Sequence, residues 1–307
     1  MADSVVTTVA LPLALAVVML GLGLTLTVPD FSRVLLHPRA VLVALTCQLV
    51  LLPVICFGLV VAVGLAPALA VGMMVLAASP GGITANVFSH LAGGDVALNV
   101  TLTAVNSVLA VLTLPIVINL SLAYFVGSGA IGLQSSKVLQ VLVLVLLPVA
   151  LGMLVRRLAP GFTAGVQSLV KVVSLAVLGL VITATVLVNR AILGESLLAV
   201  GPVALLLCTL SLLIGYAVPR LFRVDRRQSI ASAMEIGIHN AALAITVALS
   251  PLLLNNPVMA VPAAVYGLLA FVPAAIFGYV LSRRRLTTGS EVRWDQPMAA
   301  PTSRPSP

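Results

Sequence analysis

Nine long apolar segments, joined by short polar connectors, constrain the fold of this chain more than any other feature of its sequence. Each is close to the roughly 20 residues that a helix needs to cross a bilayer. In hydrocarbon every backbone N–H and C=O must be paired, which favours helices. The segments lie at about 5–28, 40–63, 67–92, 96–125, 137–157, 168–189, 197–219, 229–254 and 258–282. The sequence therefore predicts an all-α polytopic membrane protein with nine transmembrane helices.

Composition excludes a soluble protein. Of the 307 residues, 61% are hydrophobic and 8% are charged, whereas a soluble domain carries about 25% charged residues. The net charge is +8. The basic residues that produce it flank the apolar segments, so they do not indicate a nucleic-acid partner. Cys47, Cys56 and Cys208 lie inside apolar segments, which indicates buried thiols and neither disulfides nor metal ligands. The expected surroundings are a lipid bilayer, and no pattern indicates an oligomeric state.

The distribution of Lys and Arg predicts the orientation of the chain. With the N-terminus outside, fourteen of the sixteen basic residues fall in loops at 29–39, 93–95, 156–171 and 220–228 or beyond residue 282. The positive-inside rule then predicts that the C-terminus lies in the cytoplasm and that the chain spans the plasma or inner membrane. No basic stretch precedes the first segment, so we expect residues 1–28 to be a retained span. The tail, 287–307, is rich in Pro, Ser and Thr and is predicted to be disordered.

Two apolar segments are interrupted by helix-breaking and polar residues. The first interruption reads Ser79-Pro80-Gly81-Gly82-Ile83-Thr84-Ala85-Asn86, and the second reads Glu235-Ile236-Gly237-Ile238-His239-Asn240. In hydrocarbon, each unpaired backbone group costs several kcal/mol, so a break survives only beside protein or a wet cavity. Each break falls in the second span of a three-span group, 40–125 and 197–282. Corresponding breaks in two halves indicate an inverted-repeat transporter with its site near the membrane midplane.

A polar stripe follows the first break. Asn99, Thr103 and Asn106 lie at i, i+4 and i+7, on one face of the next helix. Such a stripe also arises from hydrogen bonds between packed helices. Beside a broken helix, it favours a binding site.

Glu235 is the one acidic residue well inside a predicted span. A buried carboxylate binds a cation, pairs with a base, or carries a proton; a protonated acid that serves only packing is the alternative. Asn86, Asn99 and Thr103 add the oxygen ligands that hard cations prefer. His239, four residues after Glu235, could share its helical face, as a proton relay or as a structural residue.

Two weaker candidates are single polar residues in apolar segments. Gln48 lies in mid-span and is either a ligand or a packing contact. His90 lies near the cytoplasmic end of its span and is interpreted as structural.

The sequence resembles the bile acid:sodium symporter family over residues 10–282. The matching motifs are Met19-Leu20-Gly21-Leu22-Gly23-Leu24 with Asp30-Phe31, Gln48 with Pro53, Ser79-Pro80-Gly81-Gly82 with Asn86, Leu91-Ala92 with Gly94-Asp95, and Glu235-Ile236-Gly237 with Asn240. Nine segments resemble the animal members, which lack a first helix present in some bacterial relatives. The resemblance implies one transmembrane domain, 1–286, with two crossing discontinuous helices. Its core would comprise 40–125 and 197–282, and a panel would comprise 5–28 and 137–189.

The resemblance also implies sites. A first sodium site would use Asn86, Asn99, Thr103 and Glu235, and a second would use Gln48, Glu235, the position of His239 and the backbone around Ile236 and Ile238. Substrate-facing positions would be Ile83, Thr84, Asn240, Ala270 and Phe271. Three departures stand out: Ala85 replaces a common serine ligand, His239 replaces a glutamine, and Ala270 and Phe271 replace polar residues. An imidazole nitrogen is a poor ligand for a hard cation.

The function expected from these features is symport of an organic anion by alternating access, with Na⁺ as coupling ion and no cofactor. The alternative is a proton-coupled or sodium-independent carrier that uses Glu235 and His239. An intramembrane hydrolase would need a nucleophile beside His239, and none is indicated, so we expect no enzyme. A channel or receptor without transport is a further alternative, but no ring of charge or large binding domain in the sequence supports it.

Overall fold

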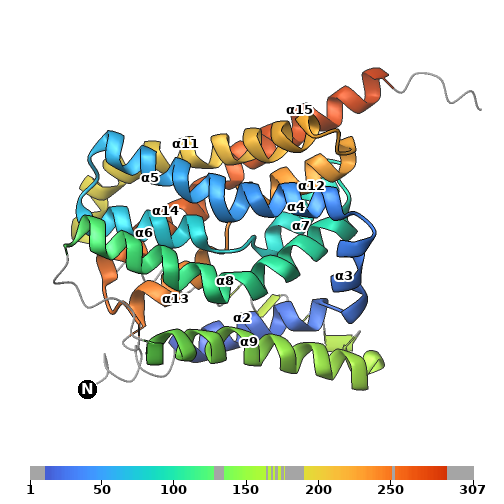
Figure 1. The fold of residues 1–307 in the computed structure, drawn as a ribbon, viewed down its shortest axis with the longest axis horizontal. Helices are drawn as coiled ribbons and strands as arrows, with labels where there is room; N and C mark the ends of the chain where they lie inside the picture. The colour runs from blue at the N-terminus through green and yellow to red at the C-terminus, as the bar shows by residue number, and fades with distance from the viewer. Residues whose placement is uncertain are drawn as a thin grey trace, which may run out of the picture.

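The computed structural model describes residues 11–127, 135–163, 190–250 and 253–288, together with residues 165–166, 169, 172–173 and 176. These residues form helices and short connectors, and the described part contains no β-strand beyond a single bridge between Gly81 and His239. Most long helices run along the long axis of the molecule (Figure 1). An all-helical fold is the form in which apolar segments pair their backbone groups within the bilayer.

The helices occur in the following order. They are α2 (Leu11–Thr25), α3 (Val28–Ser32), η2 (Arg33–Leu35), α4 (Pro38–Thr46), η3 (Cys47–Leu51), α5 (Leu52–Val63), α6 (Pro67–Ala78), α7 (Ile83–Leu91), α8 (Val96–Phe125), α9 (Ser135–Leu158), α11 (Arg190–Leu221), α12 (Arg226–Gly237), α13 (Ala241–Leu249), α14 (Pro257–Leu269) and α15 (Phe271–Thr288).

These helices coincide with eight of the nine predicted segments, and most of the sixth, 168–189, lies outside the described residues. Within the described part, three helical stretches are long and apolar enough to cross a membrane: Pro38–Val63, Leu197–Leu221 and Pro257–Arg283. A fourth, α8, passes the same test as a pair of halves bent by 55°. The bend falls four residues before Pro115, which lacks the N–H that would continue the helix. The total of nine spans and the inverted repeat stay predictions.

Both predicted breaks are present. Helix α6 ends at Ala78 and α7 begins at Ile83, whereas α12 ends at Gly237 and α13 begins at Ala241. Figure 1 shows the extended link between α6 and α7 in the middle of the bundle. Pro80 cannot donate a backbone hydrogen bond, and Gly81 and Gly82 disfavour helix, so the chain leaves the helix at this point.

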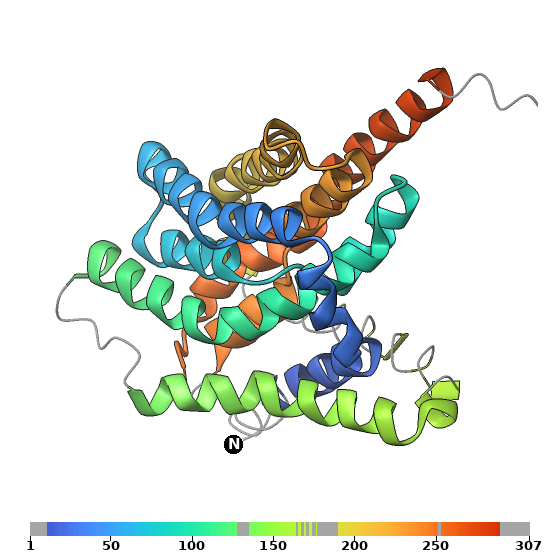
Figure 2. The same cartoon turned by 45° about the vertical axis from the view of Figure 1, so that its right-hand side comes forward.

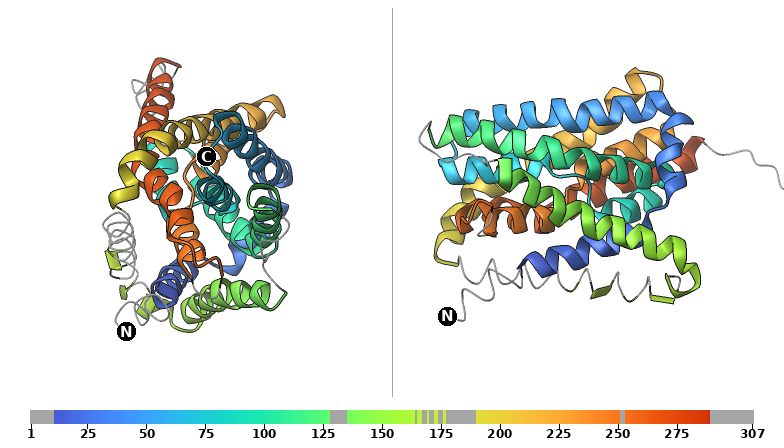
Figure 3. Two further views of the ribbon diagram at one scale, coloured as in Figure 1. Left: turned by 90° about the vertical axis from the view of Figure 1, so that its left-hand side faces the viewer. Right: turned by 60° about the horizontal axis from the view of Figure 1, so that its bottom comes forward.

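Helices α2 and α9 pack along each other and lie together below the other helices in the left view of Figure 3. A Cβ on Gly23 would overlap the backbone of Val149, and one on Gly152 would overlap the backbone of α2 near Leu24. Small residues let membrane helices approach this closely. The tail assignment from residue 289 and the start of the first segment, residues 1–10, lie outside the described residues, and α15 continues to Thr288.

Candidate ion and substrate site at the helix crossing

The two broken helices meet through their backbones. The N–H of Gly82 donates to the carbonyl of Ile238 at 2.8 Å, and the N–H of Asn240 donates to the carbonyl of Pro80 at 2.9 Å. Gly81 and His239 thereby form an antiparallel bridge. Each break satisfies backbone groups that the other leaves open, which is how interrupted helices persist at membrane depth.

The carboxylate of Glu235 lies at this crossing and is completely buried. Its Oε2 accepts hydrogen bonds from Asn99 Nδ2 at 2.8 Å and Thr103 Oγ1 at 2.6 Å. Its Oε1 accepts one from the Gly81 backbone N–H at 3.1 Å and a longer one from Asn106 Nδ2 at 3.4 Å. All three members of the polar stripe on α8 therefore face the single carboxylate of α12.

The position of Gly81 favours a residue without a side chain, because it lies directly against the Glu235 carboxyl group. A Cβ there would overlap the carboxyl group of Glu235. The absent side chain lets the backbone N–H reach the carboxylate directly, which is the structural use of this glycine.

Several buried amide oxygens near the break and on the stripe have no hydrogen-bond partner in the described part of the chain. They are Oδ1 of Asn86, Asn99 and Asn106 and Oε1 of Gln48. A buried acceptor without a donor is costly, and a hard cation satisfies such oxygens. The combination of one carboxylate with neutral oxygens fits a monovalent cation. In the described part of the chain Asn86, on α7, makes no hydrogen bond to Glu235, so its place in the set rests on its unpaired oxygen alone.

A second polar group forms around the carbonyl of Ser79. Gln48 Nε2 donates to it at 3.0 Å, and His239 Nδ1 approaches it at 3.4 Å. Gln48 lies in the π-helical turn η3, which widens the helix just before Pro53. The imidazole lies 5.3 Å from the ring of Tyr266, whose hydroxyl donates to the carbonyl of Gly237 at 2.8 Å.

The expectation that His239 shares the helical face of Glu235 is wrong. Helix α12 ends at Gly237, so the i, i+4 relation does not apply. In the described part of the chain, His239 and Glu235 form no ion pair, and Nε2 of the imidazole has no partner. The carbonyl of Ile238 is already used by Gly82. The residues implied for a second sodium site therefore divide into two groups, with Gln48 and His239 at Ser79 and Glu235 at the stripe.

The implied substrate positions surround the same crossing. Asn240 uses Oδ1 to cap α13, accepting from the Leu243 N–H at 3.0 Å, which leaves its NH₂ group for other contacts. Ala270 is buried at the junction of α14 and α15. Phe271 is 38% exposed and stacks on Phe88 of α7 at 5.8 Å.

The remaining positions at the first break add little polar surface. Ile83 begins α7, Thr84 is half-buried, and Ala85 is buried. Ala85 carries no hydroxyl, so it cannot act as a side-chain ligand.

Two groups that donate to the Glu235 carboxylate, Asn106 and the Gly81 N–H, are not in the ligand set expected from the sequence. Asn106 belonged to the stripe, and its spacing of seven residues from Asn99 was the available signal for a place at Glu235. The backbone N–H of Gly81 had no such signal, because only the crossing of the two breaks brings it to the carboxylate.

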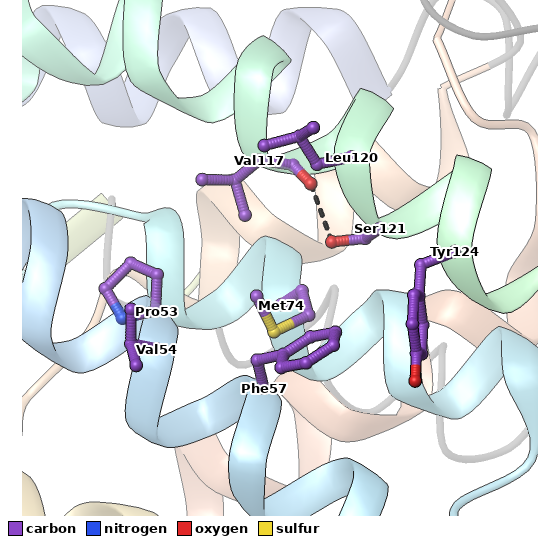
Figure 4. Close-up of a pocket in the computed structure, with 8 residues that line it drawn as sticks. All are labelled: Pro53, Val54, Phe57, Met74, Val117, Leu120, Ser121 and Tyr124. Atoms are coloured by element: carbon purple, nitrogen blue, oxygen red, sulfur yellow. Dashed lines mark hydrogen bonds between the residues drawn. The ribbon is translucent and has the colours of Figure 1, made fainter.

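An apolar pocket of about 370 Å³ lies between α5, α6 and α8 (Figure 4), and Glu235 is not among the residues that line it. It is lined by Pro53, Val54, Phe57, Met74, Val117, Leu120, Ser121 and Tyr124. The Ser121 hydroxyl donates a hydrogen bond to the Val117 carbonyl at 2.6 Å. This pocket presents no charged group, so it does not fit a coupling ion or an anionic substrate.

Apolar helices, two of them broken and crossing at a buried carboxylate, define a membrane transporter. The sequence matches the model of the sodium bile acid symporter family over residues 12–196, and the chain belongs to this family. It is a transporter and not an enzyme. The second break, with Glu235, follows the matched residues.

Known transporters are similar to this chain at moderate sequence identity. The chain is 28% identical over 244 residues to the "Uncharacterized sodium-dependent transporter YocS" of Bacillus subtilis, covering 79% of this chain and 73% of that protein. It is 28% identical over 249 residues to the "Probable sodium/metabolite cotransporter BASS1, chloroplastic" of Arabidopsis thaliana, covering 78% and 59%. With the human "Ileal sodium/bile acid cotransporter" it shares 27% over 128 residues, covering 42% and 37%. The chain thus spans less than two thirds of the latter two proteins.

Proposed function

We propose that this protein is a sodium-coupled symporter of a small organic anion. The observation that carries the proposal is the buried carboxylate of Glu235, surrounded by four donors and by amide oxygens without partners. Sodium dependence in the names of relatives from bacteria and plants supports the choice of cation. The coupling ion would be held by Glu235, Asn99, Thr103, Asn86 and Asn106.

The cation and the substrate would act together at the crossing. N–H and O–H donors hold the carboxylate, and a bound cation would neutralise the site and fix the two breaks in one arrangement. The N-termini of α7 and α13 both lie at the breaks and add partial positive charge for a carboxylate or sulfonate. Each elementary charge moved inward gains about 2.3 kcal/mol per 100 mV of membrane potential.

The moving parts would be a core and a panel. The core would contain the broken helices with α4, α5, α8, α11, α14 and α15, and the panel would contain α2 and α9. Close packing of α2 on α9 supports treating them as one body. Alternating access by rocking of one body against the other exposes a fixed site to each side in turn. The protein would lie in the cell membrane with its N-terminus outside.

The alternative is a proton-coupled or sodium-independent carrier using Glu235 and His239. The structure gives it less support, because the imidazole contacts Ser79 and Tyr266 instead of the carboxylate.

Thermal unfolding of the purified protein tests the proposal without knowledge of the substrate. A ligand that binds the native state at 100 times its Kd stabilises it by about 2.7 kcal/mol. We expect Na⁺, but not K⁺ or choline at equal ionic strength, to raise Tm in the wild type and not in Glu235→Gln. Carboxylates and sulfonates screened with and without Na⁺ should then stabilise only in its presence. Equal stabilisation by K⁺ would exclude a selective sodium site.

A further inference from the structure

A second pocket, of about 470 Å³, lies where α2 turns into α3 and meets the end of α9. Figure 2 shows α3 and the C-terminal end of α9 on the same side of the molecule. The pocket is lined by Leu26, Thr27, Val28, Pro29, Met153, Arg156, Arg157 and Pro160. It is separate from the crossing and plays no part in the cation site.

The polar side of this pocket is cationic. Arg156 is half-buried, and its guanidinium donates to the carbonyls of Leu24 and Thr25 at the end of α2, so it is fixed in place. Arg157 is exposed. The nearby carboxylate of Asp30 is engaged by Thr27 and, at 2.7 Å, by Arg33. The two arginines that line the pocket are therefore not neutralised by it.

The other side of the pocket is apolar. Leu26 is buried, whereas Val28 is 61% exposed although it is a large hydrophobic side chain. Met153, Pro29 and Pro160 complete this side. Both neighbouring helices end here, at the face for which the basic residues predict a cytoplasmic position. The pocket thus combines two guanidinium groups with apolar surface, at the end of the helices where the predicted topology places the lipid headgroups.

We propose that this pocket binds an anionic phospholipid, with its phosphate at Arg156 and Arg157 and its acyl chains along Val28 and Met153. A guanidinium is well suited to phosphate because its planar donors match the phosphate oxygens. The apolar side separates this ligand from a small soluble anion, which has no chain to cover Val28. Basic pockets between helices on the cytoplasmic side are typical headgroup sites. A lipid here would contact both the connection from α2 to α3 and the end of α9.

Native mass spectrometry of the full-length protein tests this assignment, with phosphatidylglycerol and phosphatidylcholine of equal chain length as probes. Arg157→Gln removes one pocket charge and leaves the contacts of Arg156 with α2 in place. Arg39→Gln is the matched control, because Arg39 is exposed on α4, on the same predicted face, outside the pocket. We expect the affinity for phosphatidylglycerol to fall about fivefold in Arg157→Gln, to stay unchanged in Arg39→Gln, and to return in Arg157→Lys.

Three outcomes would overturn the proposal. Equal losses in Arg157→Gln and Arg39→Gln would show only a diffuse attraction between basic face and anionic lipid. Equal binding of the two lipids would show that the headgroup charge is not read. Displacement of phosphatidylglycerol by inorganic phosphate at equal concentration would show that the site takes a soluble anion instead.

Discussion

Gly81 and Glu235 are 154 positions apart in the sequence, yet the backbone N–H of Gly81 donates to Oε1 of Glu235 at 3.1 Å. This bond joins the break between α6 and α7 to the helix that precedes the other break. We therefore expect a change in the charge or ligand of Glu235 to alter this hydrogen bond, and with it the backbone at both breaks. In the proposed mechanism, this bond would couple the site to the two breaks, which are the places where an inverted-repeat transporter changes shape.

Gly81→Ala should weaken sodium binding. The new methyl group would overlap the Glu235 carboxyl, and overpacking a buried site costs about 1–3 kcal/mol. We expect the sodium affinity, measured from Tm shifts over a sodium titration, to fall about tenfold or more. Gly58→Ala is the control, because a Cβ there meets no atom within 4 Å and the residue lies in helix α5. Equal sodium affinities in the two variants would contradict the contact.

The break between α6 and α7 could be predicted from the sequence because its causes are local. Pro80 lacks an N–H, and the glycines beside it disfavour helix. The stripe of Asn99, Thr103 and Asn106 could be predicted for the same reason, since helical spacing alone puts them on one face. That they all reach Glu235 required the tertiary fold.

The remaining features depend on how the breaks meet. The expectation for His239 extended helix α12 past Gly237, and it failed because backbone pairing between Gly82 and Ile238 competes with the helix there. The π turn at Gln48 is similar: Pro53 signals an irregularity, but a kink and a widened turn are both compatible with that signal. The structure has the widened turn, and in it the Gln48 side chain donates a hydrogen bond to the Ser79 carbonyl.

Thr103→Val should weaken sodium binding by removing a single hydroxyl. Valine keeps the shape but removes the hydroxyl oxygen proposed as a ligand, and hard cations bind through such oxygens. We expect lower sodium affinity in Thr103→Val and near-normal affinity in Thr103→Ser. Thr113→Val is the control, because the Thr113 hydroxyl donates to the Leu109 carbonyl within α8 and, among the described residues, makes no hydrogen bond to Glu235. Similar sodium titrations for Thr103→Val and Thr113→Val would count against a role for the hydroxyl.

Glu235→Ala and Asn99→Ala should abolish or sharply reduce sodium-dependent uptake while the protein is still produced and inserted. Glu235 supplies the charge of the site, and Asn99 supplies both a donor at 2.8 Å and an unpaired oxygen. Uptake of a bile acid or of an anion found in the stabilisation screen, into proteoliposomes with an inward sodium gradient, is the measurement. Normal sodium dependence in Glu235→Ala would remove the cation role of this residue.

Cysteine labelling should place the N-terminus outside and the C-terminus inside. Single cysteines at Gly129 and Asn256 should react with an impermeant maleimide added to intact cells, and those at Arg226 and Ser290 only after permeabilisation. The background should be low, because Cys47, Cys56 and Cys208 are buried. A cytoplasmic Gly129 would contradict the predicted number of spans.

The number of sodium ions per cycle is expected to be one, and His239 is the reason. The family resemblance implies a glutamine oxygen where His239 stands, and an imidazole nitrogen is a poor ligand for a hard cation. The structure adds that His239 and Gln48 both contact the Ser79 carbonyl and that, in the described part of the chain, neither forms a hydrogen bond with Glu235. We therefore expect initial rates of uptake to depend on sodium with a Hill coefficient near one.

His239→Gln should restore an oxygen ligand and move the Hill coefficient toward two, whereas His90→Gln, an exposed position on α7, should leave it unchanged. A wild-type coefficient near two would show that the imidazole does not remove the second site. The proton-coupled alternative makes a different prediction: uptake would persist without sodium and grow as the pH falls from about 7.5 to 5.5, the range in which a free imidazole gains its proton. It would also lose that dependence in His239→Gln. Because the imidazole contacts a carbonyl and the Tyr266 ring rather than a carboxylate, we expect sodium to be required throughout this range.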